Sequence, residues 1–360
     1  MAWQSSQRCT SITGIIGIRK RKKIIDKKEI MKMKELTIKQ DERSSSVQKG
    51  EKPLLEEKKS TRDGFGYALL KLGSNKNVVA LSADLTGSTK VNYFADKYPK
   101  RFFQSGVAEQ NMITMAAGLA LEGKIPFASS FGVFLPMRCL DQIRVSVCYN
   151  KTNVKLVATH CGLATGPDGA THQALEDVSA LRSLPNMTII EPCDFYQAIK
   201  ATKAAAKHKG PVYLRLHRSK SLPLTNIQTN FRLGKAQILQ KGTKVTIIGS
   251  GPILNEAFKA SEYLNFKPEI INCHTIKPLD EKTILTSVKK TKRVIVVQDH
   301  QIHGGLGSAV SELLSEKFPT KIKIIGVQDK FAESGTSEEL WNKYKVDNHT
   351  IVEEIRKLLK

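Results

Sequence analysis

The chain has 360 residues, which is enough for two domains with their own hydrophobic cores. Hydrophobic residues make up 40% of it and charged residues 25%, as in soluble globular proteins, and no apolar run is long enough to predict a membrane span. The formal net charge of +23 favours acidic ligands such as phosphorylated small molecules. We expect no nucleic-acid role, because no aromatic residues are interleaved with the basic run at 19–23 to stack on bases.

Residues 1–58 form a basic, polar segment without a visible strand pattern. Three interpretations stay open: a disordered tail, a cleaved leader, or an extension that precedes a true start at Met31 or Met33. We favour a disordered or spurious extension. The six cysteines lack CxxC spacing, so they predict buried thiols in a reducing compartment and a cytoplasmic protein.

Short apolar runs alternate with amphipathic segments from Thr61 onward. Strands are predicted at 78–84, 125–129, 154–159, 188–192 and 211–216, and helices at 63–72, 110–121, 141–149 and 195–207. This alternation is typical of a parallel α/β sheet, which we expect over residues 59–222.

A linker is predicted at 223–240, where Pro223 is followed by few strand signals. A second α/β unit is expected over 241–360, with strands at 245–249, 269–273, 293–298 and 321–327 and helices at 253–264, 307–318 and 351–359. The predicted fold class is therefore α/β, with two consecutive doubly wound domains and mostly parallel sheets.

Polar residues follow four predicted strands of the first unit. They are Asp84, the segment 129–134, His160 and Arg218. Ligands of parallel α/β sheets bind outside the carboxyl ends of the strands. The sequence therefore predicts one binding site at that edge of the first sheet.

A single carboxylate, Glu109, stands in the otherwise uncharged run 106–112. Some fifty residues later, His160, Asp168 and His172 lie in a glycine-rich stretch. One carboxylate with two imidazoles can bind a polar ligand and move protons on it near neutral pH. Glu109 could instead be an acid favoured at a helix N-terminus. The two histidines could instead bind a metal, but no carboxylate that would orient them is visible, so we expect no metal site in this chain.

These segments resemble the transketolase family over about residues 61–350. The resemblance rests on five pieces in family order: SADLT at 82–86, AEQNM at 108–112, SFGVF at 130–134, ATH at 158–160 and DGATHQ at 168–173. It implies a pyrimidine-binding domain followed by the transketolase C-terminal domain. The family's diphosphate-binding domain, with its Gly-Asp-Gly motif, has no counterpart in the sequence. The resemblance thus implies one subunit of a split transketolase, which needs a separate N-terminal subunit.

The implied reaction moves a two-carbon ketol unit from a ketose phosphate to an aldose phosphate. Thiamine diphosphate would lie at an interface, with its pyrimidine on this chain. Its diphosphate, and Mg²⁺ or Ca²⁺, would be bound mainly by the partner subunit. The resemblance also implies a homodimer contact, and so a heterotetramer.

The resemblance gives four residues to the cofactor. Glu109 would hydrogen-bond a ring nitrogen of the aminopyrimidine and favour the imino form, whose nitrogen removes the thiazolium proton. A dry pocket suits this role because burial strengthens the hydrogen bond. Phe134 would stack on the pyrimidine and Phe131 would line its pocket, although both could be ordinary core aromatics. Asp84 would contact the thiamine or order its loop, with helix capping as the alternative.

Three further residues would face the substrate. As catalytic residues, His172 would donate to the carbonyl-derived oxygen, and His160 would bind nearer the phosphate end. Asp168 would accept from the neighbouring hydroxyl. Where the family usually has Gly-Glu-Asp-Gly, this chain has Pro167 before Asp168, which could reshape the loop and the substrate preference. Cys161 also departs from the family pattern, and we assign it no role.

Arg62, Ser88 and Arg218 map to phosphate-binding positions in the family. An arginine fork can pair two phosphate oxygens at once. Surface salt bridges and a helix cap are the alternatives for these residues. In the second unit, the glycine-rich segment 303–308 could bind phosphate, but a tight turn at a subunit contact is the favoured interpretation.

Three rival functions remain open. A 1-deoxyxylulose-phosphate synthase would resemble Asp-Arg-Ala-Gly where this chain has Thr159-His160-Cys161-Gly162. The β subunit of a 2-oxo-acid dehydrogenase shares the two-domain layout but is not expected to carry the 168–173 run. A non-catalytic partner subunit would tolerate the change Glu109→Ala.

Overall fold

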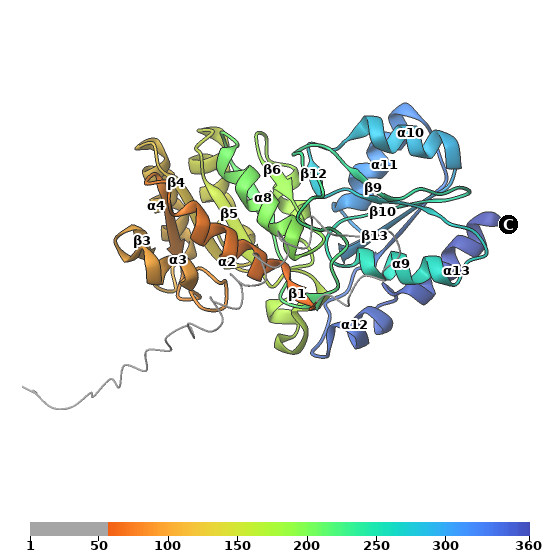
Figure 1. Cartoon of the computed structure of the whole chain (residues 1–360), viewed down its shortest axis with the longest axis horizontal. Coiled ribbons are helices and arrows are strands. Elements are labelled where there is room, and N and C mark those ends of the chain that lie inside the picture. The colour runs from red at the N-terminus through yellow and green to blue at the C-terminus, as the bar shows by residue number, and fades with distance from the viewer. Residues whose placement is uncertain (1–56) are drawn as a thin grey trace, which may run out of the picture. The chain divides into compact units, whose positions relative to one another are not determined.

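The computed structural model describes residues 57–360, so residues 1–56 of the predicted extension lie outside the described residues. Strands and helices alternate along the chain and form two large sheets (Figure 1). A short antiparallel pair, β1 (Lys59–Ser60) and β8 (Lys220–Ser221), stands apart from both sheets. The predicted α/β class with two consecutive, mostly parallel sheets is confirmed.

The first sheet has seven strands. In chain order they are β2 (Val78–Ser82), β3 (Phe102–Gln104), β4 (Ile125–Phe131), β5 (Lys155–Thr159), β6 (Thr188–Ile190), β7 (Val212–Arg215) and β12 (Thr275–Lys277). In space their order is β12-β6-β7-β5-β4-β2-β3, and every pair is parallel except β12 with β6. The edge strand β12 comes from the second half of the chain, which the local pattern did not predict.

The helices of this half connect the parallel strands. They are α2 (Thr61–Leu72), α3 (Asn92–Lys97), α4 (Glu109–Leu121), α5 (Leu135–Arg138), α6 (Leu140–Gln142), α7 (Asp177–Arg182) and α8 (Phe195–Lys207), with the short helical turns η1 (Pro99–Arg101), η3 (Leu163–Asp168) and η4 (Ala170–His172). Ser60 caps α2 through a reciprocal bond pair with Asp63, and Asp194 caps α8. The helix predicted at 141–149 is instead α6 followed by a π-helical turn, η2 (Ile143–Tyr149).

The second sheet has five strands in the spatial order β14-β13-β10-β11-β9. Their bounds are β9 (Gln237–Gln240), β10 (Thr246–Gly249), β11 (Glu269–Asn272), β13 (Val294–Gln301) and β14 (Ile322–Val327). Only β9 is antiparallel to its neighbour, and it occupies the end of the predicted linker. The helices are α9 (Leu254–Glu262), α10 (Glu281–Thr291), α11 (Leu306–Lys317), α12 (Ser337–Lys343) and α13 (Asn348–Leu359).

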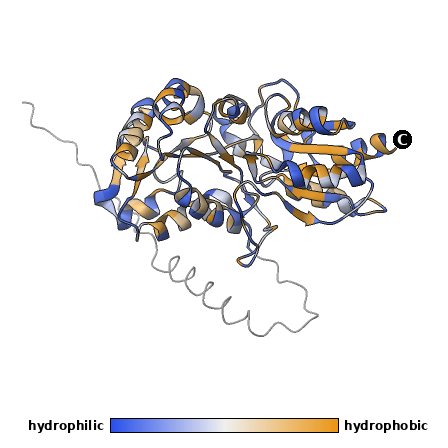
Figure 2. Ribbon diagram, turned by 90° about the horizontal axis from the view of Figure 1, so that it is seen from above, coloured by the Kyte–Doolittle hydropathy of each residue, from blue (hydrophilic) through white to orange (hydrophobic). Residues whose placement is uncertain are grey.

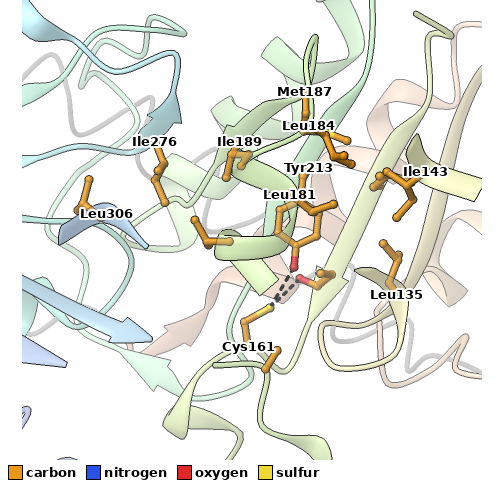
Figure 3. Packing of buried hydrophobic residues seen from close by; sticks show 14 of the residues in the cluster. Leu135, Ile143, Cys161, Leu181, Leu184, Met187, Ile189, Tyr213, Ile276 and Leu306 are labelled. Carbon is orange, nitrogen blue, oxygen red and sulfur yellow. Dashed lines mark hydrogen bonds between the residues drawn. The ribbon is translucent and has the colours of Figure 1, made fainter. Parts of the chain in front are cut away.

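Hydrophobic residues concentrate on the strands and on the inner faces of the helices (Figure 2). One buried cluster contains residues of both halves, including Leu181 and Ile189 from the first and Ile276 and Leu306 from the second (Figure 3). Because this core is continuous, the second half of the chain is packed firmly against the first. Between residues 57 and 360, no helix combines the length and apolar character needed to cross a membrane.

Candidate active site

Four adjacent strands deliver the predicted polar residues to one edge of the first sheet. Asp84 follows β2, Phe131 ends β4, His160 follows β5 and Arg218 lies three residues beyond β7. These strands are neighbours in the order β7-β5-β4-β2 and run parallel. Their carboxyl ends therefore meet at the same edge, which is where ligands of such sheets bind.

Glu109 is the first residue of α4 and its side chain is only 4% exposed. The Ser130 hydroxyl donates to its Oε1 at 3.3 Å, and Nη1 of Arg138 donates to its Oε2 at 3.1 Å. A carboxylate at a helix N-terminus is favoured by the helix dipole. A nearly buried one also needs hydrogen-bond partners, and here it has two. Glu109 is thus held as a fixed acceptor at the edge of the site.

Arg138 was not predicted from the sequence. Its guanidinium carbon lies 4.0 Å from the centroid of the Phe134 ring while its Nη1 pairs with Glu109. A flat, nitrogen-bearing group therefore stacks on Phe134 and donates to Glu109 at the same time. The aminopyrimidine that the resemblance implies is also flat and nitrogen-bearing, and it would use the same two contacts. The residues present fit this part of the cofactor.

Two phenylalanines and two histidines form one aromatic group beside Glu109. Phe131 and Phe134 are stacked with ring centroids 5.7 Å apart. His160 lies 3.9 Å from Phe131, and His172 packs edge-on against Phe134 at 5.3 Å. The residues assigned to the cofactor and those assigned to the substrate therefore form one continuous surface.

The surroundings of His160 fix its tautomer. Nη1 of Arg62 lies 3.2 Å from Nε2, and because arginine only donates, Nε2 must accept. Nδ1 then carries the proton and donates to the Thr159 hydroxyl at 2.9 Å. Burial, and then the positive charges of Arg62 and Arg218, lower the pKa of His160 to about 3. His160 is therefore neutral at physiological pH, which suits it to hydrogen bonding and limits its use as a proton carrier.

Two arginines give this end of the site a positive potential. Arg62 donates from Nη1 to the Ser88 carbonyl at 2.9 Å, while Nη1 of Arg218 pairs with Asp168 at 2.8 Å. Burial lowers the pKa of Arg62; Asp63 opposes this change and Arg218 adds to it. Two guanidinium groups beside a neutral histidine would attract an anion such as a sugar phosphate.

Asp84 lies apart from these contacts. It has a left-handed backbone with φ of 58°, its side chain is exposed, and its backbone N–H donates to Oε1 of Gln104 at 2.7 Å. Asp84 is thus the one predicted site residue whose side chain is exposed away from the others. The structure brings the remaining predicted residues together: Glu109, Phe131, Phe134, His160, His172, Asp168, Arg62, Ser88 and Arg218.

A buried network of charges beneath the site was also not predicted. Arg215, 1% exposed, donates to both oxygens of Asp177, at 2.8 and 3.2 Å, and also pairs with Glu191. Burial alone would raise the pKa of Glu191, but Arg215 and hydrogen bonds from His217 and Ser250 lower it well below its usual range. The charged residue inside strand β7 was the available signal, since a buried arginine requires acidic partners.

Comparisons with known proteins agree with this architecture. Residues 57–222 match the family description "Transketolase, pyrimidine binding domain", and residues 234–351 match "Transketolase, C-terminal domain". A Methanocaldococcus jannaschii protein named for a transketolase C-terminal section is 44% identical over 84% of this chain and 97% of its own length. A 6-deoxy-6-sulfo-D-fructose transketolase subunit of a Clostridium species is 40% identical over 81% of this chain and 92% of its own length.

A solved structure also matches over most of this chain. It is described as a split gene transketolase in an inactive β4 tetramer, and its chain is 41% identical with a TM-score of 0.78, covering 83% of this chain and 98% of that one. The two relatives and this structure are each matched over at least 92% of their own length. This chain belongs to the transketolase family and is homologous to its C-terminal subunits.

Proposed function

We propose that this chain is the pyrimidine-binding, C-terminal subunit of a thiamine-diphosphate-dependent transketolase that works with a separate N-terminal subunit. The complex transfers a two-carbon ketol unit from a ketose phosphate to an aldose phosphate. The observation that carries the proposal is that the nearly buried Glu109 pairs with the flat guanidinium of Arg138, which is stacked on Phe134. The C-terminal subunits among the relatives support the division into two chains.

When bound, thiamine diphosphate supplies the electron sink for breaking the ketose carbon–carbon bond. Glu109 would hydrogen-bond the pyrimidine, Phe134 would stack on it and Phe131 would line its pocket, while the exposed carboxylate of Asp84 would contact the thiamine. The partner subunit holds the diphosphate and Mg²⁺ or Ca²⁺. A homodimer contact between two copies of this chain then gives a heterotetramer.

The substrate lies along the aromatic and basic surface. Arg62, Ser88 and Arg218 bind its phosphate, and the neutral His160 accepts through Nε2 near the phosphate end without changing charge. His172 donates to the carbonyl-derived oxygen and Asp168 accepts from the adjacent hydroxyl. Asp168 is paired with Arg218, so a phosphate that binds Arg218 would displace the carboxylate, which is then free to orient the sugar.

The proposal is tested by reconstitution with a candidate N-terminal subunit. Ketol transfer from xylulose 5-phosphate to ribose 5-phosphate is measured with thiamine diphosphate and Mg²⁺, for each subunit alone and for the mixture. We expect activity only in the mixture, with a fall of about 100-fold or more for Glu109→Gln. The matched control is Glu256→Gln, because Glu256 is equally buried but pairs with Lys259 and the Asn348 amide outside the site.

Each result has a separate meaning. Activity of this chain alone would refute the requirement for a partner. A Glu109→Gln complex as active as the Glu256→Gln complex would refute the role of Glu109. A complex that binds the cofactor but transfers nothing to ribose 5-phosphate would indicate a different sugar substrate. The loop at Pro167 would then be the first segment to test for its effect on substrate preference.

A further inference from the structure

The loop that carries the substrate residues is held by a carboxylate from the C-terminal domain. Asp299 lies in β13 and is 2% exposed. Its Oδ1 accepts from the Leu163 amide at 2.8 Å, and its Oδ2 accepts from the Ala164 amide at 3.2 Å. These two amides begin η3, whose own preceding residue provides no side-chain cap. Asp299 thus satisfies donors that would otherwise be buried without a partner.

The residue before this turn is shaped by the same contact. Gly162 has φ of 75°, and a Cβ placed there would lie 2.4 Å from Cγ of Asp299. A side chain at 162 would therefore have to displace the carboxylate. The close approach shows that the loop and Asp299 are in direct contact, with no space left for a side chain at position 162.

A short chain of hydrogen bonds connects this contact to the substrate residues. Thr165 follows the two amides, and its hydroxyl donates to the His160 carbonyl at 2.6 Å. The Thr165 carbonyl accepts from Nη1 of Arg218 at 3.2 Å, and the same Nη1 pairs with Asp168. His160 and Arg218, both assigned to the sugar phosphate, are therefore hydrogen-bonded to Thr165, which directly follows the two residues that Asp299 holds.

The C-terminal domain makes two further contacts with this loop. Oγ of Ser337 donates to the Ala164 carbonyl at 3.3 Å, and Nε2 of Gln173 donates to the Glu333 carbonyl at 3.0 Å. Ser337 begins α12, and Glu333 lies in the segment before it. Contacts at both ends of the 163–173 loop leave it little freedom to shift.

We propose that Asp299 is a positioning residue for the sugar-phosphate site and that the C-terminal domain sets the geometry of the substrate loop through it. The inference rests on the proposed ketol transfer, because it concerns how that substrate is held. Asp299 itself does not reach the substrate. It acts through the backbone of Leu163 and Ala164, and so on His160, Asp168 and Arg218.

The first test measures the loop in the full-length purified chain. In Asp299→Asn the amide group offers one acceptor and one donor, so one of the two backbone N–H groups faces another N–H. Hydrogen–deuterium exchange at Leu163 and Ala164 is expected to quicken by roughly 10-fold or more. The matched control is Asp280→Asn. Asp280 is also buried and accepts two backbone N–H groups, from Ala236 and Thr283, but at the start of α10.

The second test uses the reconstituted complex. Misplacement of the loop should raise KM for the ketose phosphate about 10- to 100-fold. Thiamine diphosphate affinity should stay within about twofold, because Glu109 and Phe134 lie on other elements. Asp280→Asn should leave KM unchanged. Loss of stability without a change in KM, or equal effects of both substitutions, would overturn the proposal.

The two hypotheses fail in different ways. If the unmodified complex transfers no ketol unit, the proposed function fails, while the exchange measurement still decides whether Asp299 fixes the loop. If Asp299→Asn does not fold, Ser337→Ala takes its place, since it removes only one bond to the same loop. It should then raise KM about threefold at full cofactor affinity, and an unchanged KM would overturn the claim that the C-terminal domain sets the geometry of the loop.

Discussion

Arg138 occupies the contacts that the cofactor would need, and this leads to a counterintuitive prediction. Its guanidinium covers the Phe134 ring at 4.0 Å and pairs with Glu109 at 3.1 Å. A pyrimidine ring that stacks on the same face of Phe134 would have to displace the Arg138 guanidinium. We therefore expect Arg138 to compete with the cofactor, and we predict that Arg138→Met tightens thiamine diphosphate binding.

The size of the effect follows from the two contacts. Stacking of a partly exposed cation on an aromatic ring contributes about 0.5–1 kcal/mol. The ion pair is discounted because the Arg138 side chain is 48% exposed, so water screens it; such a pair contributes about 0.5–1 kcal/mol. Displacing Arg138 thus costs about 1–2 kcal/mol, and removing it should lower the cofactor Kd roughly 5- to 30-fold.

The assay is calorimetric titration of thiamine diphosphate into the reconstituted complex at fixed Mg²⁺. Arg144→Met serves as the control, because Arg144 is an exposed arginine in the next helical turn. Complex formation is checked by gel filtration for both variants. An unchanged or weaker affinity in Arg138→Met would refute competition, and would mean that Arg138 instead orients Glu109 for the cofactor.

Two further predictions concern stability. Arg215→Lys should destabilise the chain by about 3–5 kcal/mol in urea unfolding, because a lysine cannot reach Asp177 and Glu191 together. The control is Glu312→Ala, which breaks the ion pair between the exposed Glu312 and Arg182 and should cost less than about 1 kcal/mol. Equal effects would contradict the importance of the buried network. Burial lowers the pKa of His274 and of His300 to about 4, so the unfolded chain binds more protons than the folded chain between about pH 4 and 6.5. The free energy of unfolding should therefore fall as the pH drops through this window, by up to about 1.4 kcal/mol per pH unit for each histidine. His300→Gln should reduce this dependence of stability on pH. A urea midpoint that stays constant from pH 7 to pH 5 would contradict the prediction.

Much of the fold could be predicted because its strands are buried runs with clear ends. β2, β5 and β7 lie within the predicted ranges, and α8 has the predicted bounds, since its apolar spacing and the capping Asp194 are both visible in the sequence. Several elements were missed, among them β3, β12 and α12, and for two others the physical reason is plain. The helix α10 carries few apolar residues among its lysines and threonines, and β9 is an edge strand that is buried only in part.

The candidate site was predictable only where its chemistry lies in local motifs. Glu109, His160 and His172 stand in short segments of family-like sequence, so their positions could be inferred. Arg138 could not, because its exposed side chain lies 29 residues from Glu109 and no periodicity connects the two. Asp299 lies 136 residues from Leu163, and such contacts depend on how the two sheets pack.

The same long-range contacts explain why the C-terminal domain matters to the site even though the proposed cofactor residues lie elsewhere. Strand β12 completes the edge of the first sheet, and one hydrophobic cluster contains Leu181 and Leu306 together. Arg215 also donates to the Asp299 carbonyl, so the buried charges become fully paired only when both sheets are in place. A half-formed network would leave ions buried without partners, which is strongly unfavourable. The two domains should therefore fold as one unit, and the position of the substrate loop follows from that joint packing.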